Sequence, residues 1–374
     1  MNYSILIYCR AGFESEAASE ILEKSKTLNI DGYVKAKANS AFLHFYPHDP
    51  QKIFYLWENL NIHNLIFSRQ VLFCFSTLQN LPEKNRIEPI IAECEKLDKK
   101  YKEFIHHLFI EAPDTNEHKE VLNFCKKFST PLQIALEKQN LLPKKNKTQK
   151  DEKEKSSDFS NELKYNLHLF FLESKNCAIA LSLKKNASPN FMGIPRLKFP
   201  PQAPSRSTLK LEEAFLFFLT DHQRETLLKN GLQAVDLGAS PGGWTFQFVS
   251  RNIFVTAVDN ANMDKNLMDS GMVEHKKEDG FKYTPPKPVH WMVCDMVEKP
   301  SRIAKLVAHW AKFRYAQNFI FNLKLPMKKR LEEVLSCLSF LKEELSNIEG
   351  HYILECKQLY HDREEVTVWL KVLS

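Results

Sequence analysis

Acidic side chains and glycines are spaced around residue 240 as a ligand-binding turn requires. Residues 234–244 read Ala-Val-Asp-Leu-Gly-Ala-Ser-Pro-Gly-Gly-Trp, which is an apolar strand, a glycine turn and the start of a helix. Glycines allow backbone angles and close approaches that a Cβ would block. Nucleotide-like ligands bind at helix N-termini and at the carboxyl ends of parallel strands. The pattern therefore predicts a ligand site, although an ordinary strand–turn–helix corner has the same local signature.

The glycine spacing also bears on which ligand this would be. Dinucleotide sites follow the pattern G-x-G-x-x-G, whereas here Gly238 is followed by the pair Gly242 and Gly243. Asp236 adds a negative charge that would repel a pyrophosphate. A cationic cofactor without phosphates, such as S-adenosylmethionine, fits these residues better than a nicotinamide dinucleotide. Asp259 ends the next predicted strand about 20 residues on, where a carboxylate can bind ribose hydroxyls.

Five segments in a fixed order carry a resemblance to the FtsJ-type ribose 2′-O-methyltransferases. Within that group they are most similar to RlmM, a family of bacterial 23S ribosomal RNA methyltransferases. The segments are residues 204–214, 236–244, 292–300, 321–330 and 358–368. The resemblance implies S-adenosylmethionine as cofactor and 2′-O-methylation of 23S ribosomal RNA at cytidine 2498, in naked RNA or in an assembly intermediate. Methylation of another RNA such as transfer RNA, or a catalytically silent RNA-binding assembly factor, are the alternatives.

The resemblance also implies site residues, matched position by position. The catalytic set falls on Lys210, Asp295, Lys324 and Glu365, with Lys324 as the proton acceptor. Glu364 precedes Glu365 directly and is the alternative match at that position. The cofactor positions fall on Ser207, Ser240, Pro241, Gly242, Gly243, Asp259, Asp279 and Asp295. Each acid alone is more often a turn or capping residue, but these acids recur at the ends of successive predicted strands.

The proposed base places a demand on the pKa of Lys324. A ribose hydroxyl is a poor nucleophile and needs a positioned group to take its proton. An ammonium cannot accept a proton, so the pKa of Lys324 is expected to fall through burial or a neighbouring cation. Lys210 is the candidate cation, and Asp295 would oppose the shift while orienting the amine.

The composition sets wider bounds. The chain has 374 residues, a formal net charge of +6 and a pI near 8.7, which is compatible with an RNA partner without requiring one. The eight cysteines form no C-x-x-C pair and have no histidine at metal-ligand spacing. They predict reduced, buried thiols in a cytoplasmic protein without a metal site. At the N-terminus only residues 5–8 are apolar before Arg10 and Glu14, which is too short for a signal peptide or a membrane span, and a monomer is expected.

Residues 1–190 predict two small α+β modules. In residues 1–80, strands at 3–9, 33–37, 41–46 and 66–76 with helices at 13–24 and 50–60 give a ferredoxin-like order. Residues 81–190 resemble a THUMP-like RNA-binding domain, or else a plain scaffold. Its predicted elements are helices at 86–97, 115–128 and 131–139 and strands at 107–112, 165–172 and 177–183. The lysine-rich residues 144–161 predict a mobile surface loop, and the proline-dense residues 191–206 a linker.

Residues 207–374 predict an α/β domain of the Rossmann-like methyltransferase type. Seven predicted strands alternate with helices, which favours a mostly parallel sheet covered on both faces. The strands are expected at 234–238, 254–259, 273–277, 289–294, 318–324, 351–358 and 365–371. The helices are expected at 210–220, 244–251, 263–270, 302–313 and 328–346. The last two strands follow each other without a helix, so they should pair as a hairpin.

Overall fold

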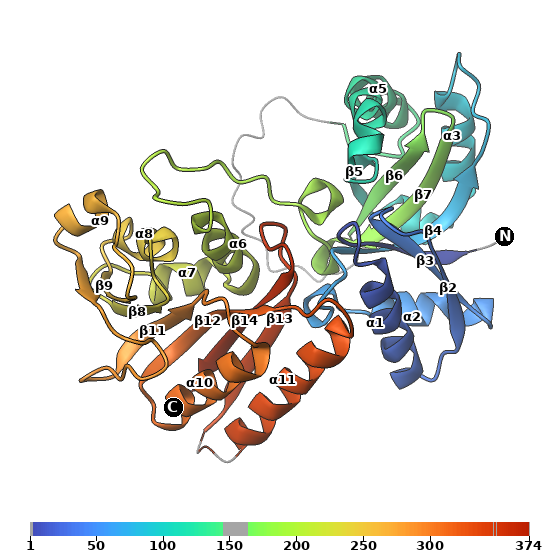
Figure 1. Cartoon of the computed structure of the whole chain (residues 1–374). Coiled ribbons are helices and arrows are strands. Elements are labelled where there is room, and N and C mark those ends of the chain that lie inside the picture. The colour runs from blue at the N-terminus through green and yellow to red at the C-terminus, as the bar shows by residue number, and fades with distance from the viewer. Residues whose placement is uncertain (1–2, 145–163, 347, 349, 374) are drawn as a thin grey trace. The chain divides into compact units, whose positions relative to one another are not determined.

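The computed structural model describes residues 3–144, 164–346, 348 and 350–373. The chain divides into two compact units, Met1–Ile194 and Pro195–Ser374, each of which is described by itself (Figure 1). The predicted mobile loop 144–161 lies outside the described residues except for Lys144. Among the described residues, no helix combines the length and the apolar character that a membrane crossing requires.

The first unit begins with the predicted ferredoxin-like arrangement. Its elements are β1 (Ser4–Tyr8), α1 (Glu14–Thr27), β2 (Gly32–Ala36), β3 (Phe42–Pro47), α2 (Ile53–Asn59) and β4 (Gln70–Leu78). The strands lie in the order β2-β3-β1-β4, and neighbours are antiparallel. Alternating apolar residues explain the helix-covered face: Leu43 and Phe45 of β3 are fully buried, while α1 packs against β2 and β3.

The rest of the first unit extends the same sheet. Its elements are α3 (Ile87–Glu95), α4 (Lys99–Lys102), β5 (Ile105–Glu111), α5 (Lys119–Lys138), β6 (Tyr165–Glu173) and β7 (Asn176–Leu183). Because β7 pairs antiparallel with β4, one seven-stranded sheet runs in the order β2-β3-β1-β4-β7-β6-β5. The ferredoxin-like and THUMP-like parts predicted from the sequence therefore share one sheet, joined by the backbone hydrogen bonds between β4 and β7.

One helix replaces two in this unit. The sequence predicts helices at 115–128 and 131–139 with a break before Pro131, whereas α5 is continuous and holds Pro131 inside it. A proline removes one backbone hydrogen bond and usually ends a helix. Here Cys125, Leu132 and Leu136 form one buried face along α5, and this packing outweighs the local preference.

The second unit has the predicted Rossmann-like architecture. Its helices are α6 (Thr208–Phe218), α7 (Asp221–Leu227), α8 (Gly243–Val249), α9 (Lys265–Asp269), α10 (Pro300–Lys312) and α11 (Arg330–Ser346). Its strands are β8 (Gln233–Leu237), β9 (Phe254–Val258), β10 (Val273–Lys276), β11 (Val289–Cys294), β12 (Ala316–Lys324), β13 (Tyr352–Lys357) and β14 (Glu365–Val372). The strand order is β10-β9-β8-β11-β12-β14-β13.

This sheet positions the site. Strands β8 to β12 run parallel to one another. Strand β14 runs antiparallel to both β12 and β13, and its pairing with β13 is the predicted hairpin. Figure 1 shows α10 and α11 on one face of the sheet and α6 to α8 on the other. The chain reverses its direction of travel across the sheet between β8 and β11, and ligands bind at the strand carboxyl ends beside such a switch point.

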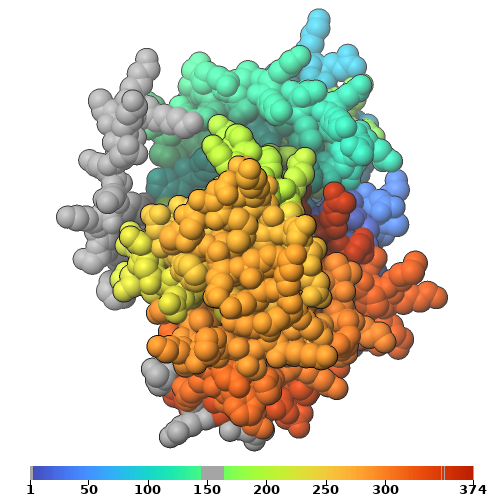
Figure 2. Space-filling view, turned by 60° about the vertical axis from the view of Figure 1, so that its left-hand side comes forward, coloured from blue at the N-terminus to red at the C-terminus, as the bar shows by residue number. Residues whose placement is uncertain are grey.

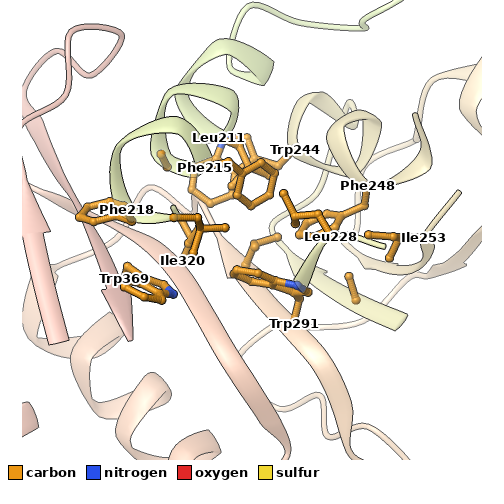
Figure 3. Close-up of a cluster of buried hydrophobic side chains, with 14 of the residues drawn as sticks. Leu211, Phe215, Phe218, Leu228, Trp244, Phe248, Ile253, Trp291, Ile320 and Trp369 are labelled. Carbon is orange, nitrogen blue, oxygen red and sulfur yellow. The ribbon is translucent and has the colours of Figure 1, made fainter. Parts of the chain in front are cut away.

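A large aromatic core holds α6, α7 and α8 on the sheet (Figure 3). Phe215 and Phe248 lie 5.7 and 6.0 Å from Trp291, measured between ring centroids. Trp291 Nε1 donates to the backbone oxygen of Leu227, at the end of α7, at 2.7 Å. The sequence prediction misses α7, although residues 220–223 read Thr-Asp-His-Gln and form a capping box.

The prediction that the cysteines are buried is confirmed. All eight cysteines are free and buried. Burial raises the pKa of the Cys294 thiol to about 12, so this side chain behaves as a small apolar residue at the end of β11.

Candidate active site

The turn after β8 requires glycine at several positions. Gly238 and Gly242 have φ angles of 76° and 114°, in the left-handed region that favours glycine. A Cβ on Gly238 would lie 2.4 Å from Met296 Cγ. A Cβ on Gly243, the first residue of α8, would lie 2.1 Å from Ser207 Oγ. The turn therefore touches both the loop after β11 and the start of α6.

The predicted cofactor acids occupy the next two strand ends. The Asp259 carboxylate accepts hydrogen bonds from the backbone N–H groups of Ser240 at 3.0 Å and Ala261 at 2.8 Å, so it ties the glycine turn to the end of β9. Asp279 is exposed, and its Oδ1 accepts from the Phe281 N–H at 2.9 Å. In Figure 2 the golden to orange part of the chain, which includes the loop around Asp279, forms much of the near face.

Asp236 has a different role from the one expected. It is 1% exposed, and Thr245 Oγ1 of α8 donates to its carboxylate at 2.7 Å. Burial raises the pKa of Asp236 to about 7, against its ordinary 3.8. The side chain faces the interior, so the expected repulsion of a pyrophosphate is not supported by its position. Its hydrogen bond instead fixes α8 to β8.

The Asp236→Asn substitution is expected to stabilise the second unit, and more so as the pH rises. The unfolded chain ionises this carboxyl near pH 3.8 and the folded one near 7, so the folded state binds more protons in between and loses stability as the pH rises. Asparagine removes this cost, which is on the order of 1–4 kcal/mol at about pH 8. Urea unfolding at about pH 5 and pH 8 measures it; an equal difference at both pH values would contradict the expectation.

The four predicted catalytic side chains converge. Lys324 ends β12, and its cross-strand partner is Glu365 at the start of β14. Lys324 Nζ donates to Asp295 Oδ1 at 2.6 Å and also to Glu365 Oε2. Lys210 of α6 reaches Asp295 Oδ2 at 3.1 Å and forms an ion pair with Glu365 Oε1. Each amine therefore bridges the same two carboxylates. Glu364 is separate, paired with Arg330 at 2.9 Å.

The charge balance contradicts the expected pKa of Lys324. Burial lowers the pKa, but the adjacent Asp295 and Glu365 carboxylates outweigh it, and the pKa of Lys324 lies above its ordinary value of 10.5. Sequence reasoning weighed the cation Lys210 and burial more heavily than the two acids. In this state the amine is an ammonium, and its proton must leave before it can act as a base.

The cluster of predicted catalytic residues and the glycine turn are neighbours. Met296, which follows Asp295, packs against Gly238. Ser207 packs against Gly243 and accepts a hydrogen bond from the Lys210 backbone N–H at 3.0 Å. Ser207 and Gly243 thus connect the cluster to the turn that carries the other predicted cofactor residues, Ser240, Pro241 and Gly242. Among the described residues, no group of His, Cys, Asp and Glu side chains could hold a metal ion.

Sequence reasoning missed three polar residues behind this cluster: Asn322, Thr367 and Asp362. Asn322 Nδ2 donates to Asp295 Oδ1 at 2.9 Å. The available signal was position, because Asn322 lies two residues before Lys324 and therefore on the same face of its strand.

This fold and site define a Rossmann-like methyltransferase. The second unit carries the corresponding family match, since residues 203–348 match the model of the FtsJ-like methyltransferases. Residues 1–72 match the RlmM ferredoxin-like domain, and residues 85–183 match the N-terminal domain of ribosomal RNA large subunit methyltransferase M. The chain belongs to the ribosomal RNA large subunit methyltransferase M family, RlmM.

Relatives match over nearly their whole length. "Ribosomal RNA large subunit methyltransferase M" of Actinobacillus pleuropneumoniae is 45% identical over 372 residues, covering 99% of each chain. The Psychromonas ingrahamii protein of that name is 43% identical over 371 residues, covering 99% of this chain and 96% of the relative.

Two solved structures resemble the chain weakly. A putative rRNA-methylase from Clostridium thermocellum has a TM-score of 0.34 and 16% identity, covering 46% of this chain and 98% of its own. Aeropyrum pernix fibrillarin has a TM-score of 0.30 and 13% identity, covering 54% and 81%.

If S-adenosylmethionine is the cofactor, the Gly243→Ala substitution is expected to weaken its binding by about 10- to 100-fold, because overpacking by one methyl group costs roughly 1–3 kcal/mol. The new Cβ would enter the space of Ser207 Oγ and Ser205 Oγ, which lie 2.1 and 2.3 Å from it. Calorimetric titration measures the affinity. Gly271→Ala is the control, because its φ of 69° brings backbone strain while no atom lies within 4 Å; equal losses in both variants would contradict the steric argument.

Proposed function

We propose that this protein transfers a methyl group from S-adenosylmethionine to the 2′-oxygen of a ribose in large-subunit ribosomal RNA, at cytidine 2498 of 23S ribosomal RNA. The observation that carries the proposal is the convergence of Lys210, Asp295, Lys324 and Glu365 beside the glycine turn. Membership of the RlmM family supports the RNA substrate, because the curated relatives are named for ribosomal RNA methylation.

The residues at the turn fit the proposed cofactor. Both oxygens of Asp259 accept backbone N–H groups, and a carboxylate has further lone pairs for ribose hydroxyls. Gly242 and Gly243 bring the backbone to the start of α8 without side chains. Asp279, at the exposed loop after β10, is the proposed partner of the adenine amino group. When bound, the cofactor supplies a methyl group on a positively charged sulfur.

Lys324 is the proposed base. Its neutral amine would take the proton of the 2′-hydroxyl as the oxygen–methyl bond forms and the sulfur–methyl bond breaks. Asp295 and Glu365 accept hydrogen bonds from the amine and fix its direction. Lys210 bonds to the opposite oxygens of both acids, which limits the rotation of their carboxylates. The four side chains thus position the nitrogen for an in-line transfer.

The first unit is proposed to bind the RNA. Residues 81–190, assigned here as THUMP-like, match the N-terminal family model over residues 85–183. Free 23S ribosomal RNA and an assembly intermediate are both proposed partners, and the chain is proposed to act as a monomer.

A labelling experiment tests the activity. Purified protein is incubated with tritiated S-adenosylmethionine and either unmodified 23S ribosomal RNA, an assembling large subunit or transfer RNA. The expected result is one label on the ribose of cytidine 2498. Label on a base would refute ribose methylation, label in transfer RNA would favour the alternative substrate, and no label in any RNA would favour a silent assembly factor.

The rate is expected to rise with pH. Because the pKa of Lys324 is raised in the free protein, the fraction of neutral amine grows about tenfold per pH unit, so kcat/KM should rise without a plateau up to about pH 9. Glu365→Gln removes one negative charge, lowers the pKa of Lys324 and should move the rise to lower pH. A wild-type kcat/KM that is flat from about pH 6 to 9 would exclude a base with a raised pKa.

A further inference from the structure

A neutral pair of side chains lies directly behind the charged pair at the strand ends. Asn322 of β12 is paired in register with Thr367 of β14, two residues from the pair of Lys324 and Glu365. Residues two apart on a strand share a face, so the row of polar side chains continues from the site into the core. Asn322 and Thr367 are both 0% exposed.

This pair connects Asp295 to a further acid, Asp362, in the loop between β13 and β14. Asn322 Nδ2 donates to Asp295 Oδ1 at 2.9 Å. Thr367 Oγ1 lies 2.8 Å from Asn322 Oδ1 and 2.9 Å from Asp362 Oδ2. The Leu359 backbone N–H donates to the same Asp362 oxygen at 3.0 Å. A continuous chain of hydrogen bonds therefore runs from Asp362 to the carboxylate that holds both lysines.

A count of protons fixes the state of this chain. The Asp295 carboxylate only accepts, so the amide of Asn322 must point its NH₂ at Asp295 and its oxygen at Thr367. The Thr367 hydroxyl has a single hydrogen, which the Asn322 oxygen requires. The contact between Thr367 Oγ1 and Asp362 Oδ2 then lacks a hydrogen unless Asp362 supplies it. A protonated Oδ2 donates to Thr367 and still accepts from the Leu359 N–H.

The surroundings of Asp362 favour the same state. The side chain is 0% exposed, and its Oδ1 has no hydrogen-bond partner among the described residues. Burial, followed by the negative charges of Glu365 and Glu213, raises the pKa of Asp362 well above its ordinary value, while Lys210 acts in the opposite direction. Glu213 is itself held by the backbone N–H groups of Tyr360 and His361, both at 2.8 Å, and lies 2.6 Å from His361 Nδ1.

We propose that Asp362 is a neutral carboxylic acid in the working protein and that, through Thr367 and Asn322, it is a positioning residue for Asp295. The inference rests on the proposed ribose methylation. An ionised Asp362 would leave the hydrogen-bond chain one proton short and would let Asn322 and Asp295 rotate. It would also add a negative charge next to a cluster whose acids already keep Lys324 protonated, and so would oppose formation of the base.

Substitutions at Thr367 test the connection. Thr367→Val keeps the shape but removes both hydroxyl contacts, and kcat should fall by about 100-fold because a small displacement at the reacting centre has that effect. The Kd for S-adenosylmethionine and the KM for RNA should stay near wild-type values. Thr367→Ser restores the hydroxyl and should recover most of kcat. Thr226→Val is the matched control, since that hydroxyl is exposed and donates to the backbone oxygens of His222 and Gln223.

Two results would overturn the connection. One is a Thr367→Val protein with the kcat of the wild type. The other is a Thr367→Ser protein that is folded but as slow as Thr367→Val. If the wild type methylates no RNA at all, the proposed function fails, whereas an active wild type with an unaffected Thr367→Val variant refutes only the present inference.

The protonation of Asp362 can be measured without catalysis, which keeps the inference testable if Thr367→Val does not fold. Infrared difference spectra between wild type and Asp362→Asn, with ¹³C-labelled aspartate, report the carbonyl band of a protonated carboxyl group. At about pH 8, where an ordinary aspartate is fully ionised, the wild type should show this band and the variant should lose it. A difference spectrum with only carboxylate bands would refute the neutral state.

Discussion

Replacing Lys324 with alanine is expected to lower kcat by about 10²- to 10⁴-fold, the usual contribution of a positioned base, while S-adenosylmethionine still binds. The reason is geometric: Lys324 Nζ is held 2.6 Å from Asp295 Oδ1 and is also bonded to Glu365, whereas Lys210 bonds to the opposite oxygens of both acids. Single-turnover methylation measures the chemical step, and calorimetry measures cofactor affinity.

Two further variants separate a base from a structural cation. Lys324→Arg keeps a positive charge between the acids, but arginine does not lose its proton in proteins, so this variant should be as slow as Lys324→Ala. Lys312→Ala, at an exposed position on α10, should leave kcat unchanged. An active Lys324→Arg protein would show that the charge matters rather than proton transfer.

Replacing Trp291 with alanine is expected to destabilise the second unit by about 3–5 kcal/mol, the usual cost of truncating a buried large aromatic residue. The side chain is 0% exposed, packs against Phe215 and Phe248, and donates to the Leu227 backbone oxygen. The substitution leaves a cavity in the cluster of buried side chains around Trp291 that Figure 3 shows, and it removes the hydrogen bond to the Leu227 backbone oxygen. Denaturant unfolding followed by tryptophan fluorescence measures the free energy.

Two control variants show how the loss in the free energy of unfolding depends on the volume removed and on the exposure of the side chain. Trp291→Phe keeps most of the ring and loses only the hydrogen bond and part of the volume, so its loss should be clearly smaller. Met327→Ala, at a side chain that is 94% exposed, should stay within about 0.5 kcal/mol of wild type. Equal losses for Trp291→Ala and Trp291→Phe would mean that the hydrogen bond, rather than the packing, supplies the stability.

Local patterns in the sequence predict most of the second unit. The alternation of strand-like segments with helical segments locates its strands, and the absence of a helix between residues 358 and 365 predicts the antiparallel pair of β13 and β14. The resemblance to the family predicts the residues at positions 210, 295, 324 and 365 as the catalytic set, and the structure brings these four side chains together. Each of these signals lies within a short stretch of chain, where spacing and geometry are directly related.

Long-range contacts account for what the sequence prediction missed. The direction of the Lys324 pKa shift depends on Asp295 and Glu365, which lie 29 and 41 residues away in the sequence. No local sequence pattern indicates that these two acids affect the pKa of Lys324 more strongly than Lys210 and burial do. The burial of Asp236 follows from the packing of α8 on β8. In the first unit, the helix through Pro131 and the pairing of β7 with β4 also depend on tertiary packing, which overrides the local preference.

The pairing of β7 with β4 has a consequence for how the first unit can be divided. A cut near residue 80 would remove the partner of β7 and leave a row of unpaired backbone N–H and C=O groups along it. Such an open edge tends to recruit strands from other molecules. The fragment that starts at residue 81 should therefore self-associate, whereas a chain ending at residue 194 keeps the sheet whole.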